Sequence, residues 1–306
     1  MVSVVIPTYN RAQLVSRGIE SVLKQTYRDI EVIVVDDASN DNTTDVINAI
    51  GDQRIRYVKH QVNKGVSESR NTGIKIAKGQ LVGFLDSDDE WLPEKLRKQV
   101  DRFSQVPDDT GLVYGACLFV DEKTKKPIRV VTPKKRGDVF KDMLMGDFVM
   151  SPTPLVKREC FDRAGLFDRD FSTSEDWDMW LRIAQHYKFD FVRDLVAKYY
   201  VSPSQTTNDA STVVQGYLKF MAKHDSLISG NPAILAHHFK AIGEMYLIHH
   251  EYHLANTYYA RAICTDPRNV SLYVHLLAAR TLPRAYVALG TWLNMRLEQL
   301  RHRWPG

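Results

Sequence analysis

Short apolar runs rich in β-branched residues alternate with helical periodicity over the N-terminal third of the chain. The runs have the length and composition of buried strands and lie at 2–6, 31–35, 55–58 and 81–85. Segments with apolar residues at helical spacing lie between them, at 14–25, 43–50 and 66–78. This alternation predicts an α/β fold, in which helices cover both faces of a mostly parallel central sheet.

Polar residues gather where three of these strands end. The clusters are Pro7-Thr8-Tyr9-Asn10 after the first strand, Asp36-Asp37-Ala38-Ser39 after the second and Asp86-Ser87-Asp88-Asp89 after the fourth. Ligands of open α/β sheets bind beyond the carboxyl ends of the strands. We therefore expect the three clusters to lie at one binding site.

The pattern changes to longer strands and loops after residue 111. Apolar runs at 112–120 and 128–132 flank the turn-like segment 121–126, which predicts a β-hairpin. A basic run, Lys134-Lys135-Arg136, follows the hairpin. For such a run a solvated loop is favoured over a phosphate contact.

The chain from about residue 233 is helical in pattern and has the spacing of one tetratricopeptide repeat. The matching positions are Gly243, Tyr246, Ala255, Tyr259, Ala262 and Pro267. A single repeat cannot bury a solenoid core, so we expect this helix pair to dock on the main domain. A stabilising appendage is favoured over a peptide receptor. The predicted domains are 1–222, which holds the predicted sheet, and 223–306, a helical C-terminal region.

The last segment, from Pro283, is basic and amphipathic. On a helix its apolar stripe would consist of Tyr286, Leu289, Leu293, Leu297 and Leu300. Two interpretations stay open for it. It lies on the anionic inner face of a membrane as a peripheral contact, or it packs on the main domain with its arginines solvated.

Composition narrows the class of protein. The chain has 306 residues, 44% hydrophobic and 25% charged, as in ordinary globular proteins. Its three cysteines share no ligand-like spacing, so we expect neither disulfides nor zinc, and a cytoplasmic location. No export signal or membrane span is expected, and no nucleic acid as partner. Residues 1–222 hold 32 Lys/Arg and 32 Asp/Glu, so the net charge of +4 lies in the tail.

The strand-end aspartates are the main candidates for chemistry. Asp86 and Asp88 form a D-x-D element, whose oxygen ligands suit a divalent cation shared with phosphates. A D-x-D pattern often occurs by chance at caps and turns. Here an apolar strand precedes it and a polar helix follows it, which makes the pattern more specific. Asp37 is placed to accept hydrogen bonds from a nucleobase imide or a ribose hydroxyl.

The segment 63–73 passes from a loop into a helix. Its N-terminal backbone amides, together with Arg70, can face an anion. Alternatively, Gly65 permits a turn, Ser67 caps the helix and Arg70 is solvated. The residues themselves do not decide between the two.

Another helix opens at Ser174. Asp176 and Trp180 are four residues apart on one helix face, so an acid and an aromatic platform can point together into a cleft. The alternative for Asp176 is charge stabilisation of the helix N-terminus. Asp178 and Arg182, also four apart, predict a surface ion pair.

Five motifs in this order resemble the family 2 glycosyltransferases, nucleotide-sugar enzymes of the GT-A fold. They are Val4-Val5-Ile6-Pro7-Thr8-Tyr9-Asn10, Asp36-Asp37-Ala38-Ser39, Asn63-Lys64-Gly65 with Ser69-Arg70-Asn71-Thr72-Gly73, Phe84-Leu85-Asp86-Ser87-Asp88-Asp89, and Ser174-Glu175-Asp176. Each motif is weak alone, but five in order at family-like spacing are highly specific. The resemblance covers residues 2–201.

The resemblance implies a role for individual residues. It assigns the base and ribose pocket to Pro7, Thr8 and Asp37, with Arg70 near it. It assigns the ribose and a Mg²⁺ or Mn²⁺ on the diphosphate to Asp86 and Asp88, with Asp89 in support. Asp176 matches the last acid of the family's T-E-D motif, the general base, although Ser174 replaces the threonine.

The implied reaction is an inverting sugar transfer. The metal neutralises the leaving diphosphate while a carboxylate removes the proton of an acceptor hydroxyl on the opposite face. The expected donor is a UDP-sugar, and a single sugar is transferred because the Q-x-x-R-W motif of processive members is absent. The acceptor stays open among cell-envelope polysaccharide, lipid-linked glycan and protein glycan.

Two other functions fit parts of the pattern. A nucleotidyltransferase also uses strand-end aspartates and a metal, but it needs a Gly-rich basic loop after the first strand, which this chain lacks. A non-catalytic adaptor would bind a partner through its helical tail. A degenerate enzyme is expected to have lost Asp86, Asp88 or Asp176, and all three are present.

Overall fold

The computed structural model describes residues 1–202, 209–281 and 283–284. The chain forms two compact units, Met1–Pro203 and Ser204–Gly306. The predicted domain boundary, after residue 222, falls near the end of helix α8 (Ala210–Lys223). This helix belongs to the second unit, where it packs against α10 (Pro232–Ile248).

The first unit contains a single nine-stranded sheet in its described part. Its strands are β1 (Val2–Thr8), β2 (Ile30–Asp36), β3 (Ile55–Lys59), β4 (Leu81–Phe84), β5 (Glu90–Trp91), β6 (Thr110–Asp121), β7 (Pro127–Val131), β8 (Leu155–Lys157) and β9 (Lys188–Val201). Its helices are α1 (Ala12–Leu23), α2 (Thr43–Ile50), α3 (Val66–Ile76), α4 (Lys95–Phe103), α5 (Phe140–Met145), α6 (Glu159–Ala164) and α7 (Glu175–Ala184).

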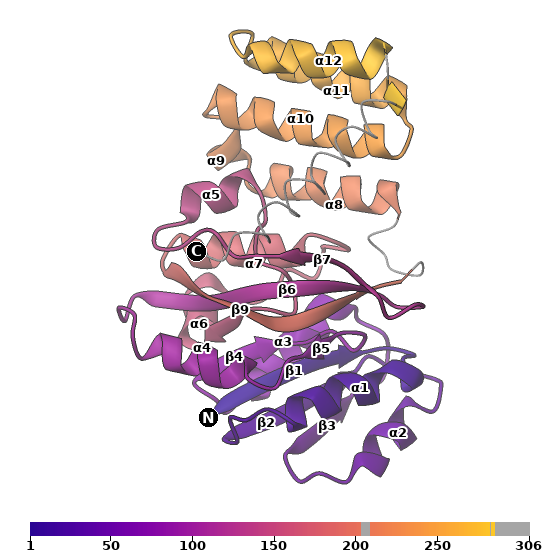
Figure 1. Ribbon diagram of the computed structural model, residues 1–306, viewed down its shortest axis with the longest axis vertical. Coiled ribbons are helices and arrows are strands. Elements are labelled where there is room, and N and C mark those ends of the chain that lie inside the picture. Colours follow the sequence, from indigo (N-terminus) through magenta and orange to yellow (C-terminus); the bar gives the residue numbers. More distant parts are fainter. Residues whose placement is uncertain (203–208, 282, 285–306) are drawn as a thin grey trace. The chain divides into compact units, whose positions relative to one another are not determined.

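The strand order is β3-β2-β1-β4-β8-β6-β9-β5, and β7 pairs with β6 (Figure 1). The first four strands are parallel, as are β6 and β9, whereas β8 runs antiparallel to β4 and β6. The longest ladders are therefore parallel, and the predicted α/β fold is confirmed. The β6–β7 hairpin is confirmed as well.

Helices cover both faces of the first strands. β1 is buried over its whole length, as a strand packed on both faces must be. Val4 lies in one core cluster with Val15 and Ile19 of α1. On the other face α3 lies against β1. The two are so close that a Cβ on Gly73 would come within 2.3 Å of Val5 Cγ1. Glycine at this position allows the close approach that sets the start of α3 beside the sheet edge.

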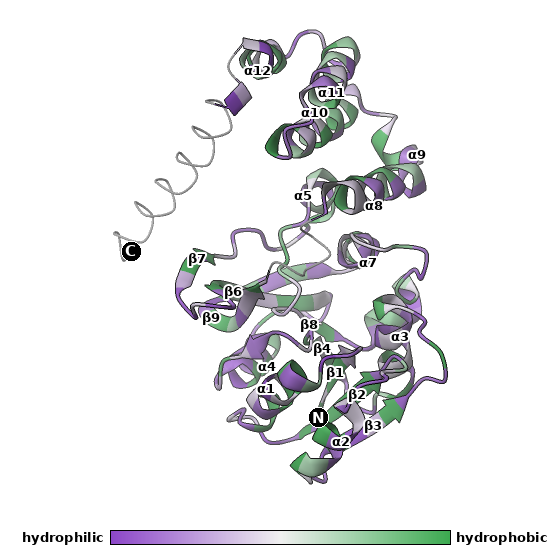
Figure 2. Cartoon of the chain, turned by 90° about the vertical axis from the view of Figure 1, so that its right-hand side faces the viewer, coloured by the Kyte–Doolittle hydropathy of each residue, from purple (hydrophilic) through white to green (hydrophobic). Residues whose placement is uncertain are grey.

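The second unit consists of helices in its described part. They are α8, α9 (Asp225–Ile228), α10, α11 (Tyr252–Thr265) and α12 (Val270–Thr281). Figure 2 shows hydrophobic and hydrophilic residues interleaved along α10 and α11, as amphipathic helices require. The predicted helix pair is confirmed: a Cβ on Gly243 would lie 3.1 Å from Tyr259 Cε1, and Ala255 and Ala262 are buried.

The predicted amphipathic segment from Pro283 lies almost entirely outside the described residues, so both interpretations of it stay predictions. Among the helices that are described, none combines the length and the apolar character that crossing a membrane requires.

Candidate active site

The predicted polar clusters meet at the carboxyl ends of β1, β2 and β4. The Asp37 N–H donates to the Thr8 carbonyl at 2.8 Å, and the Asn10 N–H donates to Ser39 Oγ at 2.8 Å, so the loops after β1 and β2 interlock. Asn10 and Ala38 have φ angles of 50° and 67°. Non-glycine residues adopt this left-handed region at a cost, and such strain clusters at functional sites.

Asp37 is buried and accepts three hydrogen bonds. Its Oδ1 accepts from His60 Nδ1 at 2.7 Å and from the Lys64 N–H at 2.9 Å, and its Oδ2 accepts from the Gly65 N–H at 2.7 Å. A carboxylate offers about four acceptor positions, so Oδ2 keeps one. The adjacent Thr8 Oγ1 is buried without a partner in the described structure. These two oxygens are polar groups that a ligand can satisfy.

His60 was not among the predicted site residues. It follows β3 directly, so the strand-end rule that selected the aspartates would also have found it. Its Nε2 lies 3.0 Å from Thr72 Oγ1, which fixes the ring between Asp37 and α3.

Arg70, in α3, binds three carboxylates that come from two distant parts of the chain. Its Nη1 donates to Glu175 Oε1 and Asp176 Oδ1, both at 2.8 Å, and its Nη2 donates to Asp86 Oδ1 at 2.9 Å. Only 3% of the side chain is exposed. Burial opposes the charge of Arg70, but the three carboxylates outweigh it and raise the arginine pKa. Burial also raises the pKa of Glu175 and of Asp176, against the lowering effect of Arg70.

The alternative interpretation of the segment 63–73 is wrong on two points. Arg70 is buried rather than solvated, and Ser67 makes no capping hydrogen bond through its side chain. Gly65 does permit a turn, since its φ is 85°. The anions that face Arg70 and the Lys64 and Gly65 amides are carboxylates of this chain.

The D-x-D loop presents two partly exposed carboxylates. The side chain of Asp86 is 29% exposed and that of Asp88 is 18% exposed. Asp86 Oδ2 accepts from Ser151 Oγ at 3.1 Å, and Asp88 Oδ2 accepts from Arg11 Nη1 at 3.0 Å. Burial and the nearby Asp86 raise the pKa of Asp88. Ser151 and Arg11 were not predicted as partners, because neither belongs to a motif that points to the loop.

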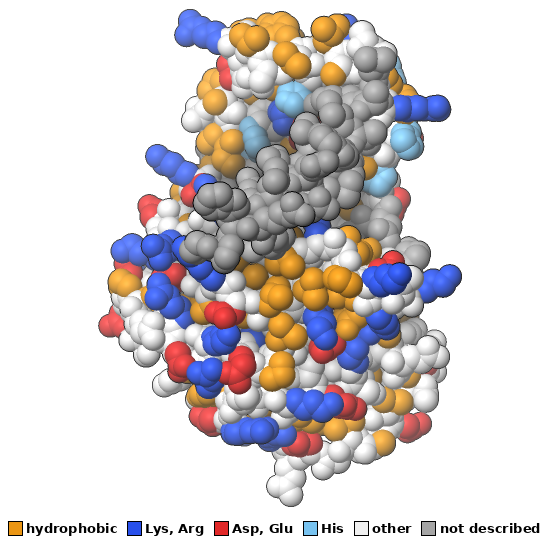
Figure 3. Space-filling model, viewed as in Figure 1, with side chains coloured by type: hydrophobic (Ala, Val, Ile, Leu, Met, Phe, Trp, Pro, Cys, Tyr) orange, Lys and Arg blue, Asp and Glu red, His pale blue; other side chains and the backbone are white. Residues whose placement is uncertain are grey.

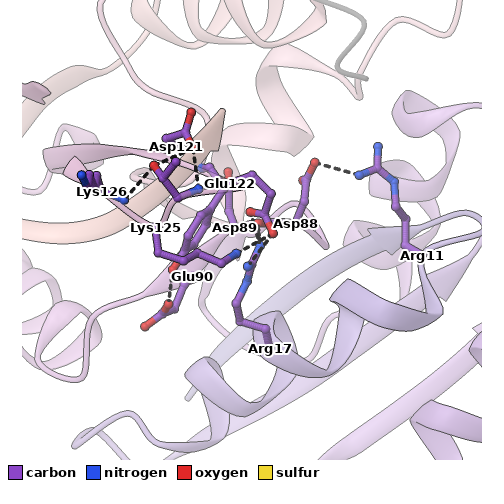
Figure 4. A network of polar contacts seen from close by, with 11 residues as sticks. Arg11, Arg17, Asp88, Asp89, Glu90, Asp121, Glu122, Lys125 and Lys126 are labelled. Atoms are coloured by element: carbon purple, nitrogen blue, oxygen red, sulfur yellow. Dashed lines mark hydrogen bonds and ion pairs between the residues drawn. The ribbon is translucent and has the colours of Figure 1, made fainter. Parts of the chain in front are cut away.

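Asp89 and Arg17 tie this loop to the rest of the unit (Figure 4). Asp89 is 1% exposed, and its Oδ1 accepts from the Tyr200 N–H at 2.9 Å. Burial, with the charges of Asp86 and Asp88, raises the Asp89 pKa well above its usual range. Arg17 donates to the Asp88 carbonyl, and Arg17 Nη1 lies 3.1 Å from Glu122 Oε1. Asp89 thus holds the loop from behind.

Helix α7 starts at the site but buries most of its side chains. Ser174, just before it, has a φ of 67°, and Asp176 is in the first turn. The predicted aromatic platform is wrong, because Trp180 is 1% exposed and its ring centroid lies 6.3 Å from that of Phe84 and 6.0 Å from that of Phe167. Trp180 therefore belongs to the core under the site.

The second predicted pair on α7 forms, but it is not on the surface. Arg182 Nη2 lies 2.8 Å from Asp178 Oδ2, and Asp178 is fully buried. Arg182 also donates to the carbonyls of Ala164 and Leu166, so it joins α7 to the segment after α6.

The donor set fits a divalent cation that is shared with a substrate. No three His, Cys, Asp or Glu side chains of the described residues form a complete protein cage for a metal. Mg²⁺ is usually held by one or two carboxylates together with substrate phosphates, and Asp86 and Asp88 supply two. The local charge also favours a cation, because Asp86, Glu175 and Asp176 share the single guanidinium of Arg70.

Comparison with known proteins identifies the family. Residues 3–160, just over half of the chain, match Glycosyl transferase family 2. The chain belongs to this family. The resemblance drawn from the five motifs is therefore confirmed, and the protein is a glycosyltransferase.

Individual relatives of this glycosyltransferase agree with that result. WfgD of Escherichia coli, a UDP-Glc:alpha-D-GlcNAc-diphosphoundecaprenol beta-1,3-glucosyltransferase, is 29% identical over 211 residues, which are 68% of this chain and 80% of WfgD. The mannosyltransferase PcManGT of Pyrobaculum calidifontis, solved with GDP-Man and Mn²⁺, is 21% identical with a TM-score of 0.60, over 95% of this chain and 84% of PcManGT.

TarS of S. aureus is a third similar protein. Its structure is 19% identical to this glycosyltransferase with a TM-score of 0.59, over 94% of this chain and 53% of TarS. A TarS fragment has also been solved in complex with UDP-GlcNAc. These structural likenesses show a GT-A-like fold.

Proposed function

We propose that this glycosyltransferase uses a divalent cation and moves one sugar, with inversion, from a UDP-sugar to a hydroxyl of a lipid-linked glycan. The observation that carries the proposal is the bridge made by Arg70. Its Nη2 holds Asp86 of the D-x-D loop, and its Nη1 holds Asp176 of α7. Two carboxylates so close together support a site in which one serves the leaving diphosphate and the other serves the acceptor hydroxyl.

The donor base and ribose are proposed to bind at Thr8 and Asp37. Asp37 Oδ2 keeps one acceptor position for the imide N–H of uracil, and Thr8 Oγ1 lacks a partner in the described structure. Pro7 lies in the buried end of β1 and would form part of the pocket wall. PcManGT binds GDP-Man, whereas WfgD is named for UDP-Glc. The higher identity to WfgD favours a UDP-sugar.

Asp86 and Asp88 are proposed to hold Mg²⁺ or Mn²⁺. When bound, the metal neutralises charge on the leaving diphosphate. Arg11 and Arg70 add positive charge at the same edge, where they pair with these two aspartates. Asp89 supports the loop from behind, through the backbone of β9. The complex of PcManGT with Mn²⁺ is in line with this choice of metal.

Asp176 is proposed as the general base. Burial raises its pKa, which strengthens it as a proton acceptor, while the Arg70 guanidinium favours its ionised form. Removal of the acceptor proton by Asp176 would accompany attack on the donor from the face opposite the diphosphate. One base and one metal suffice for this direct displacement, which inverts the anomeric centre.

The acceptor is proposed from the name of WfgD, which specifies a GlcNAc-diphosphoundecaprenol. A lipid-linked diphosphate sugar is therefore favoured over a free polysaccharide or a protein glycan. Peripheral contact with a membrane would suit such an acceptor.

A transfer assay with the purified chain tests the proposal. UDP-glucose, a synthetic polyprenyl diphosphate sugar and Mn²⁺ should yield UDP and a glycosylated lipid whose new bond has the configuration opposite to that of the donor. Excess chelator should abolish the product. Full activity in excess chelator would exclude a role for the metal. A product that retains the configuration of the donor would exclude inversion. Transfer from GDP-mannose but not from UDP-glucose would exclude a UDP-sugar as the donor.

A further inference from the structure

The β6–β7 hairpin and the loop after it concentrate positive charge. Segment 123–136 contains seven Lys/Arg and no Asp/Glu. The other residues of 1–222 contain 25 Lys/Arg against 32 Asp/Glu, so the rest of this region is acidic. On the lower part of the face seen in Figure 3, acidic and basic side chains are intermixed. The segregation of charge onto one hairpin therefore stands out from the rest of the unit.

Three lysines of this segment form no ion pair with an acidic side chain among the described residues. Lys125 pairs with Glu122 at 2.7 Å and Lys135 pairs with Asp142 at 2.5 Å. The ones that form no such pair are Lys123, Lys126 and Lys134, and all three are exposed. Their side chains are exposed to solvent, and Lys123 lies near an acidic residue, Asp121 at the base of the hairpin. Such a concentration of exposed lysines attracts an anionic surface.

The hairpin also presents apolar surface. Ile128, near the start of β7, is 53% exposed. Along its length β7 pairs with β6 and with no other strand of the described sheet, so it is an edge strand. An exposed apolar side chain among lysines suits the interface of a bilayer, where apolar burial and attraction to anionic headgroups add together.

The base of the hairpin is joined directly to the D-x-D loop (Figure 4). Glu122, just after β6, binds Arg17, and Arg17 donates to the Asp88 carbonyl. Lys125 Nζ lies 4.9 Å from the centre of the Tyr200 ring, and the Tyr200 N–H holds Asp89. The Arg17 side chain alone therefore links Glu122, at the base of the hairpin, to the D-x-D loop, the proposed diphosphate site.

We propose that segment 123–136 is the surface with which this enzyme docks on an anionic lipid bilayer. The inference rests on the proposed function, because a lipid-linked diphosphate acceptor has its sugar at the bilayer surface. Docking through the hairpin would bring the metal loop to that surface. The charge of the segment complements the anionic headgroups, and Ile128 enters the interface.

Cosedimentation with vesicles tests the docking surface. The full chain should bind vesicles of phosphatidylcholine with phosphatidylglycerol, and binding should weaken with salt. Each basic residue near an anionic surface strengthens binding about fivefold, so Lys123→Glu/Lys126→Glu/Lys134→Glu should weaken it at least about 100-fold. A matched control, Arg28→Glu/Arg56→Glu/Lys78→Glu, makes the same charge change at exposed positions on the amino-terminal side of the sheet and should bind much as wild type does.

Three outcomes overturn the proposal. They are no binding by the wild type at low salt, unchanged binding by the hairpin variant, and an equal loss in hairpin and control variants. Hydrolysis of the UDP-sugar in the absence of vesicles should be the same in wild type and hairpin variant, which shows that the variant is folded. If the wild type binds vesicles through the hairpin but transfers no sugar to a lipid-linked acceptor, the proposed function fails and the docking surface stands.

Discussion

Replacement of Arg70 by methionine removes the charge that joins the two halves of the site. The carboxylates left without this partner are 29%, 12% and 17% exposed, in Asp86, Glu175 and Asp176 respectively. Breaking a buried ion pair by removing one partner costs about 3–5 kcal/mol, because an uncompensated charge stays buried. For a unit of this size 1 kcal/mol corresponds to about 2–4 °C, so the unfolding midpoint should fall by about 6–20 °C at neutral pH.

The loss should depend on pH. Burial already raises the pKa of Glu175 and Asp176, so the native state binds more protons than the unfolded chain does. Stability therefore decreases as pH rises from the unfolded pKa of about 4 through the raised native pKa. Without Arg70 these pKa values rise further, and the decrease becomes steeper. The deficit of the variant should be smaller at about pH 5, where the carboxylates can take up protons, than at about pH 8.

Thermal unfolding of Arg70→Met and wild type at both pH values measures this difference. Arg56→Met is the control, since Arg56 is exposed and donates to the Ile76 carbonyl at 3.1 Å. The control should lose little at either pH. A deficit of Arg70→Met that is equal at the two pH values, or no larger than that of the control, would refute the argument that Arg70 holds three ionised carboxylates.

Three other changes test separate parts of the molecule. Asp88→Ala should abolish metal-dependent turnover while the unfolding midpoint stays near that of wild type; activity that survives at ordinary Mn²⁺ concentrations would contradict the ligand assignment. Asp176→Asn should lower kcat by about 10²- to 10⁴-fold with little change in the donor KM, and a raised KM with unchanged kcat would show that Asp176 is not the base. Gly243→Val should lower the free energy of unfolding of the helical unit by about 1–3 kcal/mol, measured by denaturant titration, because its side chain has no room beside Tyr259; an unchanged midpoint would show that this contact is loose.

The main elements of the first unit were predictable because each carries its own hydrophobic period. The predicted strand 31–35 corresponds to β2, Ile30–Asp36, and the predicted helix 43–50 is α2, Thr43–Ile50. β9, Lys188–Val201, was not predicted, nor were β5 and β8. For β5 and β8 the reason is that strands of two and three residues are too short to show a period. Their pairing is set by the strands beside them in the sheet, which the local sequence does not encode.

The site residues that follow a strand were predictable from their position, whereas for Arg70 and Asp176, which lie in helices, the residues themselves left an alternative open. Asp37 and Asp86 were found from position alone, since the ends of parallel strands meet at one edge. The contacts that join distant segments of the chain at the site were not predictable: Arg70 reaches Asp176 across 106 residues, and Arg17 reaches Glu122 across 105. Trp180 was misassigned because helical spacing gives a shared face without saying which face is buried.

The pairing of the D-x-D carboxylates with arginines bears on how the proposed metal would be taken up. Asp86 is bound to Arg70 and Asp88 is bound to Arg11, so a cation alone must compete with two guanidinium groups. A cation that arrives on a diphosphate changes this balance, because phosphate oxygens are themselves good partners for arginine. The same arginines that oppose the free ion can then stabilise the complex. The arrangement therefore favours the metal together with the nucleotide sugar over the metal by itself, and it explains how a cluster of acids can stay folded when no cation is bound.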